Sequence, residues 1–318
     1  MLKKTAMLKK TALLGLTIAS LVSATPVSAR ELSFVGITVG NLSNPFFVQL
    51  AKGAEAKVKE IAGDKAKVTV VTADYELNKQ YMQIEDFITS GVDMVLINAA
   101  ASNAMEASLK RLREAGIVSV AVDVAAEGTD ATVTTDNVQA GEQACQYIVE
   151  KLQGRGNVII IDGPPVSAVT DRIQGCKSVL SRHPEIKILS ESQDGKVQSP
   201  DGFDVVANLL NTFSKIDAIF TINDPEAITT DLAARQLGRK EFFITSVDGA
   251  PDVVAALKQP DSLIHASSSQ DPYLMAQKAV EIGQEILRGA KPAQDTVLIP
   301  SQLVTRDNVA EYKGWTSR

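Results

Sequence analysis

The chain has 318 residues, of which 45% are apolar and 22% charged, and its formal net charge at pH 7 is −6. This length is enough for one large or two ordinary domains, and the composition is typical of a globular protein. The net negative charge and the lack of a Lys/Arg-rich block after the first residues argue against a nucleic-acid partner.

The first 29 residues have the pattern of a secretory signal peptide. A basic start, MLKKTAMLKK, precedes an apolar stretch, TALLGLTIASLV, that is too short to span a bilayer. Small residues at positions 27–29 form a signal-peptidase site, so we expect cleavage near Ala29 and a mature chain that begins at Arg30. The sequence therefore predicts an exported protein.

From Phe34 almost to the end, short Val/Ile-rich runs alternate with segments whose apolar residues recur at helical spacing. The alternation begins with FVGITVG (34–40) and PFFVQLAKGAEAKVKEIA (45–62) and ends with PYLMAQKAVEIGQEILRG (272–289). Continuously apolar strands are typical of parallel sheets covered by helices on both faces. Because residues 123–135 form a loop and a short strand without a helix, the pattern favours two doubly wound α/β units over one closed barrel.

Polar residues follow many of the predicted strands, at the sheet edge where ligands bind in such folds. Two adjacent aromatics follow the first strand, and an arginine begins the helix after the Gly-Pro-Pro turn. The candidate contacts are Asn44, Phe46, Phe47, Asp123, Arg172, Asn223, Asp248 and Gln270. Carboxylates and amides opposite aromatic rings suit a polyhydroxylated ligand, because its C–H faces pack on rings while its hydroxyls form hydrogen bonds.

Several of these candidates also have a purely structural explanation, which the sequence leaves open. Phe46 or Phe47 can belong to the core, and Asn44 can cap the helix that follows it. In the pairs Asn223–Asp224 and Gln270–Asp271, we expect the amide to face the ligand and the aspartate to cap the helix.

Taken together, the motifs along the mature chain resemble the periplasmic sugar-binding proteins of the ribose-binding type. These motifs are NPFF from Asn44, VAVD ending at Asp123, TTDN around Asp136, DRIQG around Arg172, IND at Asn223, VDGAPD at Asp248 and SSQDP at Gln270. The resemblance implies a type I periplasmic binding protein fold, with two α/β lobes joined by three crossovers and a sugar enclosed between them. It implies a first lobe of residues 30–136 and 270–296, and a second lobe of residues 137–269 and 297–318.

The resemblance also assigns roles to the candidate residues. It implies first-lobe contacts from Asn44, Phe46, Phe47 and Asp123, and further polar contacts from Arg172, Asn223, Asp248 and Gln270. The chain departs from the ribose-binding pattern at Val124, where an arginine is expected, and at Val247, where a phenylalanine is expected. A second-lobe aromatic is also missing near residues 197–199. We therefore expect a different pentose, a hexose or a polyol, with Ser167 and Thr170 as replacement partners.

Two further features concern the second lobe. Cys145 and Cys176 lie in consecutive predicted helices, and a disulfide between them would close a loop of about thirty residues, worth roughly 3–4 kcal/mol. The alternative is two small buried side chains. In the C-terminal tail, we expect Tyr312 and Trp315 to pack the tail onto the second lobe.

Other function classes fit the sequence less well. Asp123 and Asp248 would suit the acid/base pair of a carbohydrate-active enzyme, but GxSxG, HExxH and Walker motifs are absent, and His183 and His265 are isolated. A transcriptional repressor would need a helix-turn-helix where the signal peptide stands. We expect a periplasmic, monomeric binding component of an ABC importer, with no catalysis, cofactor or metal. It would deliver its sugar or polyol to the membrane permease, and a chemoreceptor is the alternative partner.

Overall fold

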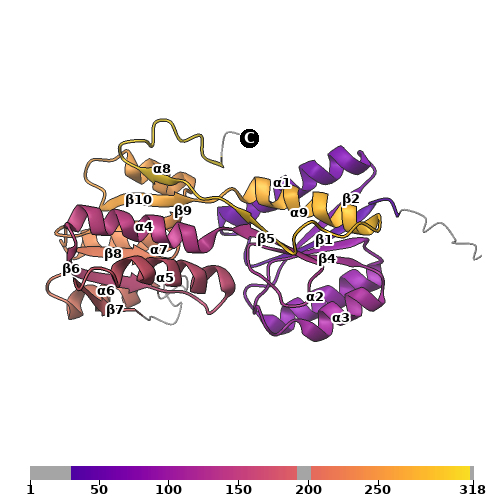
Figure 1. The fold of residues 1–318 in the computed structure, drawn as a ribbon, viewed down its shortest axis with the longest axis horizontal. Helices are drawn as coiled ribbons and strands as arrows, with labels where there is room; N and C mark the ends of the chain where they lie inside the picture. The colour runs from indigo at the N-terminus through magenta and orange to yellow at the C-terminus, as the bar shows by residue number, and fades with distance from the viewer. Residues whose placement is uncertain (1–29, 192–201, 316–318) are drawn as a thin grey trace, which may run out of the picture.

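The computed structural model describes residues 30–191 and 202–315 and shows two α/β lobes side by side (Figure 1). The predicted signal peptide and the position near residues 197–199 lie outside the described residues. Each lobe contains one six-stranded sheet. The prediction of two doubly wound, parallel-sheet lobes is confirmed.

The first lobe is built on a sheet with the strand order β2-β1-β3-β4-β5-β11, in which all pairs are parallel. Its strands are β1 (Phe34–Val39), β2 (Lys67–Thr72), β3 (Met94–Ile97), β4 (Val118–Val122), β5 (Ala131–Thr135) and β11 (Thr296–Ile299). Its helices are α1 (Pro45–Ala62), α2 (Leu77–Ser90), α3 (Glu106–Glu114) and α9 (Pro272–Leu287).

The second lobe repeats this strand order as β7-β6-β8-β9-β10-β12, except that the edge strand β12 is antiparallel. Its strands are β6 (Arg155–Ile161), β7 (Glu185–Ser190), β8 (Ala218–Thr221), β9 (Phe243–Asp248), β10 (Ile264–Ser269) and β12 (Leu303–Thr305). Its helices are α4 (Asn137–Leu152), α5 (Ser167–Leu180), α6 (Gly202–Thr212), α7 (Asp224–Gln236) and α8 (Pro251–Leu257).

The chain passes between the lobes after β5, after β10 and between β11 and β12. The first two crossings lie at Asp136 and Gln270. The third lies at residues 300–302, later than the predicted boundary at residue 297, because Val297 pairs with Val133 in the first sheet. The strand ends before Pro300, which has no N–H to donate to a sheet ladder.

The C-terminal segment contacts both lobes, which corrects the prediction for Trp315. Tyr312 donates a hydrogen bond to the carbonyl oxygen of Gly249 at 3.3 Å, so it packs on the second lobe as expected. The Trp315 ring, however, lies 5.8 Å from the Phe46 ring, centroid to centroid, within the first-lobe core. The sequence could not show that the tail returns across the hinge to an aromatic partner in the other lobe.

A disulfide joins Cys145 of α4 to Cys176 of α5. The two helices lie unusually close, because a Cβ placed on Gly141 of α4 would stand 2.0 Å from the backbone oxygen of Arg172 in α5. A side chain at this glycine would therefore push α5 away. The close contact and the disulfide together fix the helix that carries Arg172.

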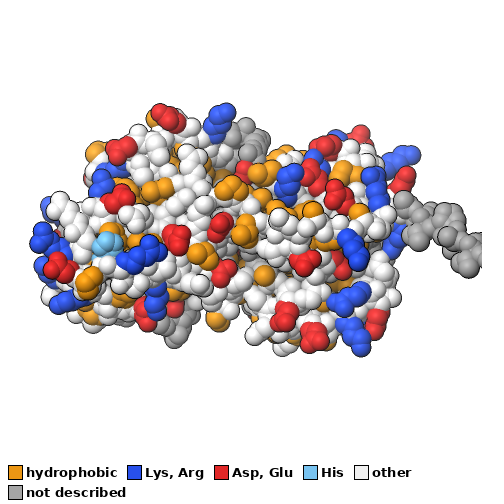
Figure 2. All heavy atoms as spheres, in the orientation of Figure 1, with side chains coloured by type: hydrophobic (Ala, Val, Ile, Leu, Met, Phe, Trp, Pro, Cys, Tyr) orange, Lys and Arg blue, Asp and Glu red, His pale blue; other side chains and the backbone are white. Residues whose placement is uncertain are grey.

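The surface carries charges of both signs over both lobes. On the face drawn in Figure 2, basic and acidic side chains are interspersed rather than gathered into one patch of a single sign. Within residues 30–191 and 202–315, no helix is long and apolar enough to cross a membrane.

Candidate ligand-binding site

A cavity of about 70 Å³ lies between the two lobes, at the carboxyl ends of their strands. All eight residues predicted as ligand contacts line this one cavity: Asn44, Phe46, Phe47, Asp123, Arg172, Asn223, Asp248 and Gln270. Four of them come from the first lobe, three from the second, and Gln270 from a hinge crossing. The structure therefore brings together the residues that the strand-end rule selected.

The first lobe contributes an aromatic wall. The side chain of Asn44 caps α1 by accepting a hydrogen bond from the Phe46 backbone N–H at 3.0 Å, and Pro45 occupies the first turn. The rings of Phe46 and Phe47 meet edge to face, 5.3 Å apart. Both rings line the cavity and also belong to the first-lobe core, so each ring has both a structural role and a position in the cavity.

Two buried aspartates at the ends of β4 and β9 face the cavity in strained backbone conformations. Asp123 has φ 65° and Asp248 has φ 139°, values that non-glycine residues seldom adopt and that concentrate at functional sites. Asn98 donates to the Asp123 carboxylate at 2.9 Å, and Gln270 donates to that of Asp248 at 2.7 Å. Burial raises the pKa of Asp123 to about 6, against the opposing effect of the Arg172 charge.

Arg172 is the cation of this site and is only 4% exposed. Its Nε donates to Asn137 Oδ1 at 2.8 Å, its Nη1 donates to the Ile222 carbonyl oxygen at 2.8 Å, and Nη1 lies 3.6 Å from Asp248 Oδ1. Within the described residues no hydrogen-bond acceptor is recorded for Nη2. This guanidinium edge is therefore available to a ligand hydroxyl.

The roles of Asn223 and Asp224 differ from the prediction. Asn223 itself caps α7 by accepting from the Glu226 N–H at 3.0 Å, while it also lines the cavity. Asp224 instead accepts hydrogen bonds from the Ser267 hydroxyl and the Ala250 N–H, both at 2.7 Å. It thereby supports the loop after β9, an interaction between distant segments that sequence could not show.

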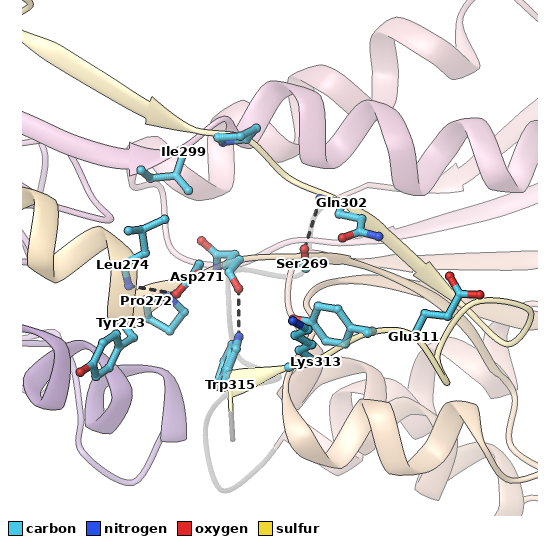
Figure 3. A pocket seen from close by; sticks show the side chains of 14 residues that line it. Ser269, Asp271, Pro272, Tyr273, Leu274, Ile299, Gln302, Glu311, Lys313 and Trp315 are labelled. Carbon is cyan, nitrogen blue, oxygen red and sulfur yellow. Dashed lines mark hydrogen bonds between the residues drawn. The ribbon is translucent and has the colours of Figure 1, made fainter. Parts of the chain in front are cut away.

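At the other predicted pair, Asp271 caps α9 as expected, by accepting from the Leu274 N–H at 2.9 Å. Figure 3 shows this bond in a second hollow, about 660 Å³, beside the hinge crossings. In the same view Trp315 donates to the Gln270 carbonyl oxygen at 3.0 Å. Of the eight predicted contacts only Gln270 lines this hollow, so the cavity between the lobes is the better candidate site.

Ser167 and Thr170, the predicted replacement partners, do not line the cavity. Ser167 accepts a hydrogen bond from the Ala125 N–H at 2.9 Å, and its own N–H donates to Ser102 at 3.1 Å. Both partners belong to the first lobe, so Ser167 holds the two lobes together in this conformation. Thr170 is exposed and donates to the Ser167 carbonyl oxygen. The cavity lining therefore gives no support to Ser167 and Thr170 as ligand partners.

Three residues near the cavity escaped the sequence-based prediction. Asn98 directly follows β3 and could have been found by the same strand-end rule. Tyr75 lies three residues after β2 and lines the cavity. Asn137 begins α4 and orients Arg172, a contact over 35 residues of sequence that no local pattern reveals.

The charges around the cavity favour a neutral ligand. Asp123 and Asp248 line it together with the single guanidinium of Arg172, and the backbone N–H of Asp224 donates to the Asp248 carboxylate at 3.2 Å. A ligand with its own negative charge would meet more carboxylates than cations here. Hydroxyl groups, in contrast, can donate to the carboxylates and accept from the guanidinium and the amides.

Comparison with known proteins supports the same interpretation. Residues 35–291 match the periplasmic binding protein domain family. The chain is 32% identical to the ribose import binding protein RbsB of Bacillus subtilis (strain 168), over 86% of this chain and 87% of the relative. It is 25% identical to a xylitol-binding protein of Mycolicibacterium smegmatis, over 86% and 78% of the two chains.

Solved structures show the same fold. A solute-binding protein of an ABC transporter from Burkholderia graminis C4D1M, in complex with D-arabinose, superposes with a TM-score of 0.80 at 26% identity, over 89% of this chain and 98% of that chain. The Caulobacter myo-inositol binding protein superposes with a TM-score of 0.80 at 23% identity, over 90% and 97% of the two chains. The chain described here therefore belongs to the periplasmic binding protein domain family, among relatives of the ribose-binding type.

Proposed function

We propose that this protein is the exported binding component of an ABC importer and that it carries a neutral monosaccharide or polyol. The observation that carries the proposal is the inter-lobe cavity, which is lined by two buried carboxylates, one guanidinium and four amides together with two phenylalanine rings. This set matches the donors, acceptors and C–H faces of a polyhydroxylated ring or chain.

The mechanism follows from the position of the site between the lobes. A ligand that contacts Asp123 in the first lobe and Arg172 in the second stabilises the conformation in which the lobes meet. The hinge crossings at Asp136, Gln270 and residues 300–302 are the places where the chain can absorb this motion. The membrane permease would recognise the surface that the two closed lobes form together.

The same closed lobes would suit a chemoreceptor, so we keep sensing as a second role for this protein. Catalysis is the less favoured alternative, since the relatives named above are binding proteins. In the family to which the chain belongs, the periplasm is the place of action, and we propose that residues 1–29 direct export there.

A thermal-shift screen of the purified protein tests this proposal. The protein is first unfolded and refolded to remove bound ligand, then mixed with tetritols, pentoses, pentitols, hexoses and inositols. A ligand at a thousand times its dissociation constant stabilises the folded state by about 4 kcal/mol, which corresponds to a rise in Tm of several degrees. Recovery of the ligand in chemically unchanged form would exclude the alternative that the protein is an enzyme. The absence of a shift with every compound would contradict the sugar assignment.

A further inference from the structure

Tyr75 has an unusual backbone conformation for an aromatic residue. It lies in the loop between β2 and α2 with φ 60°, in the left-handed region that glycine and asparagine favour. Its neighbour Asp74 also has a positive φ, but that side chain points to the surface, where it bonds to Asn41 and Lys79. Strain of this kind persists where surrounding contacts hold it, and it is frequent at functional sites.

The contacts that hold Tyr75 are aromatic. Its ring lies 6.5 Å from the Phe47 ring at an interplanar angle of 61°. The residue beneath both rings is Gly40, which directly follows β1. A Cβ placed there would stand 2.6 Å from Tyr75 Cε1 and 2.9 Å from Phe47 Cε2. The two rings therefore meet only because this position has no side chain.

Tyr75 stands between two spaces. On one side it lines the ligand cavity of about 70 Å³. On the other it lines a groove of about 420 Å³ at the mouth of the cleft, whose second-lobe side includes Pro225 and Ile228. The residue is 42% exposed. Tyr75 shares the lining of the ligand cavity with Asp123 and Asp248, one carboxylate from each lobe.

We propose that Tyr75 is the wall that sets the upper size limit of the ligand. The inference rests on the proposed function and deepens it: the chain selects compact polyhydroxylated ligands, such as tetritols and pentoses, over hexoses and inositols. The cavity is small beside the roughly 300–1,000 Å³ of typical ligand pockets. Removal of the Tyr75 ring would join it to the groove, and the joined space would admit a larger ligand.

Isothermal titration of the full protein tests this inference with a tetritol, a pentose, a hexose and myo-inositol as probes. Tyr75→Asn removes the ring and keeps a residue that tolerates φ 60°, so the variant should fold with an unchanged or higher Tm. We expect the ratio of compact-ligand to hexose affinity to fall by about tenfold or more, because one aromatic contact is lost and space is gained.

Two further variants separate the effect of the Tyr75 ring from the effects of the strained backbone and of the phenol hydroxyl. Tyr75→Phe keeps the wall and should keep the wild-type ratio. Asp74→Asn changes the neighbouring left-handed residue without touching the ring, and it should also leave the ratio unchanged. If Tyr75→Asn binds all probes with the wild-type ratio, the size-limit inference is wrong while the proposed function stands. If the wild-type protein binds none of the probes, the proposed function fails, and the inference with it.

Discussion

The two lobes share one strand order but face the cavity with different chemistry. The first lobe presents three aromatic rings, Phe46, Phe47 and Tyr75, and one carboxylate, Asp123. The second presents Arg172, Asn223 and Asp248 on an aliphatic floor and contributes no aromatic to the cavity lining among the described residues. Under the proposed function, the first lobe would supply the surface that packs on the C–H face of the ligand, and the second would supply most of the polar groups that fix its hydroxyls.

The lobes also differ in how the cavity residues are supported. Arg172 stands on α5, which is joined to α4 by the disulfide and by the close contact at Gly141. The aromatic wall stands on α1, which packs on Trp315 and also lies close to α9, because a Cβ placed on Gly53 would stand 2.3 Å from the backbone oxygen of Tyr273. No disulfide joins α1 to α9, however, because both cysteines of the chain belong to the bond between α4 and α5. A polar site needs fixed angles for its hydrogen bonds, whereas an aromatic wall tolerates small shifts. The covalent support is therefore found in the lobe that needs the more exact geometry.

The largest effect on stability and binding is expected in the second lobe, at Arg172. Arg172→Ala leaves buried Asp248 and Asp123 without their cation, so we expect unfolding to become easier by about 3–5 kcal/mol at pH 7 and ligand binding to be lost. Because the carboxylates become neutral as the pH falls, the difference from wild type should shrink at pH 5. Urea unfolding at both pH values measures it. Phe47→Leu, on the aromatic side, is the matched control and should show no such pH dependence.

The disulfide is expected to be the next largest contribution. Its ends are 31 residues apart, and its removal in the Cys145→Ala/Cys176→Ala variant should cost about 3–4 kcal/mol of unfolding free energy in the chain-entropy model. Hydrogen exchange should speed up in α4 and α5 and stay unchanged in α1 and α9. Equal acceleration in both helix pairs would show that the support is not confined to the second lobe.

A smaller and pH-dependent effect is expected at Asp123, whose pKa of about 6 lies above its value in the unfolded chain. The folded state therefore holds this proton more tightly, so the contribution of Asp123 to stability is lost as the pH rises from about 4 to about 6. Ligand hydroxyls need the ionised carboxylate, so affinity should change in the opposite direction and weaken by about tenfold from pH 7 to pH 5.

The Asp123→Asn variant isolates this group. It should bind more weakly at pH 7, by about 1.5–3 kcal/mol, because a charge-assisted hydrogen bond is lost. Its affinity should also vary less between pH 5 and pH 7 than that of the wild type, in titration calorimetry at both values. If the affinities of both proteins depended on pH in the same way, Asp123 would not be a ligand contact.

The smallest expected effect concerns the contact between the C-terminal segment and the first lobe. Phe46 and Trp315 meet edge to face, so a double-mutant cycle with Phe46→Leu and Trp315→Leu should give a coupling energy of about 0.5–1.5 kcal/mol. Unfolding free energies of the two single variants and the double variant provide this value. Additive single effects would show that the contact does not couple the tail to the first lobe.

The sequence by itself determined the fold class and the charged residues, the two phenylalanines and three of the four amides of the cavity lining. The strand segments are continuously apolar rather than alternating, which indicates buried parallel strands. The polar residues that follow these strands converge at one edge of each sheet. The eight candidate residues therefore reached a single cavity. Each of these inferences depends on local pattern, which a chain carries in its order of residues.

Only the tertiary structure decided which side chains support the cavity and which limit it. The contacts of Arg172 with Asn137, of Asp224 with Ser267 and of Trp315 with Phe46 each join segments far apart in sequence. The third crossing depended on a pairing of Val297 that its local pattern does not specify. The strained backbone of Tyr75 is stable only because Gly40 leaves room for two rings. Such contacts arise from packing in three dimensions, and a one-dimensional pattern does not encode them.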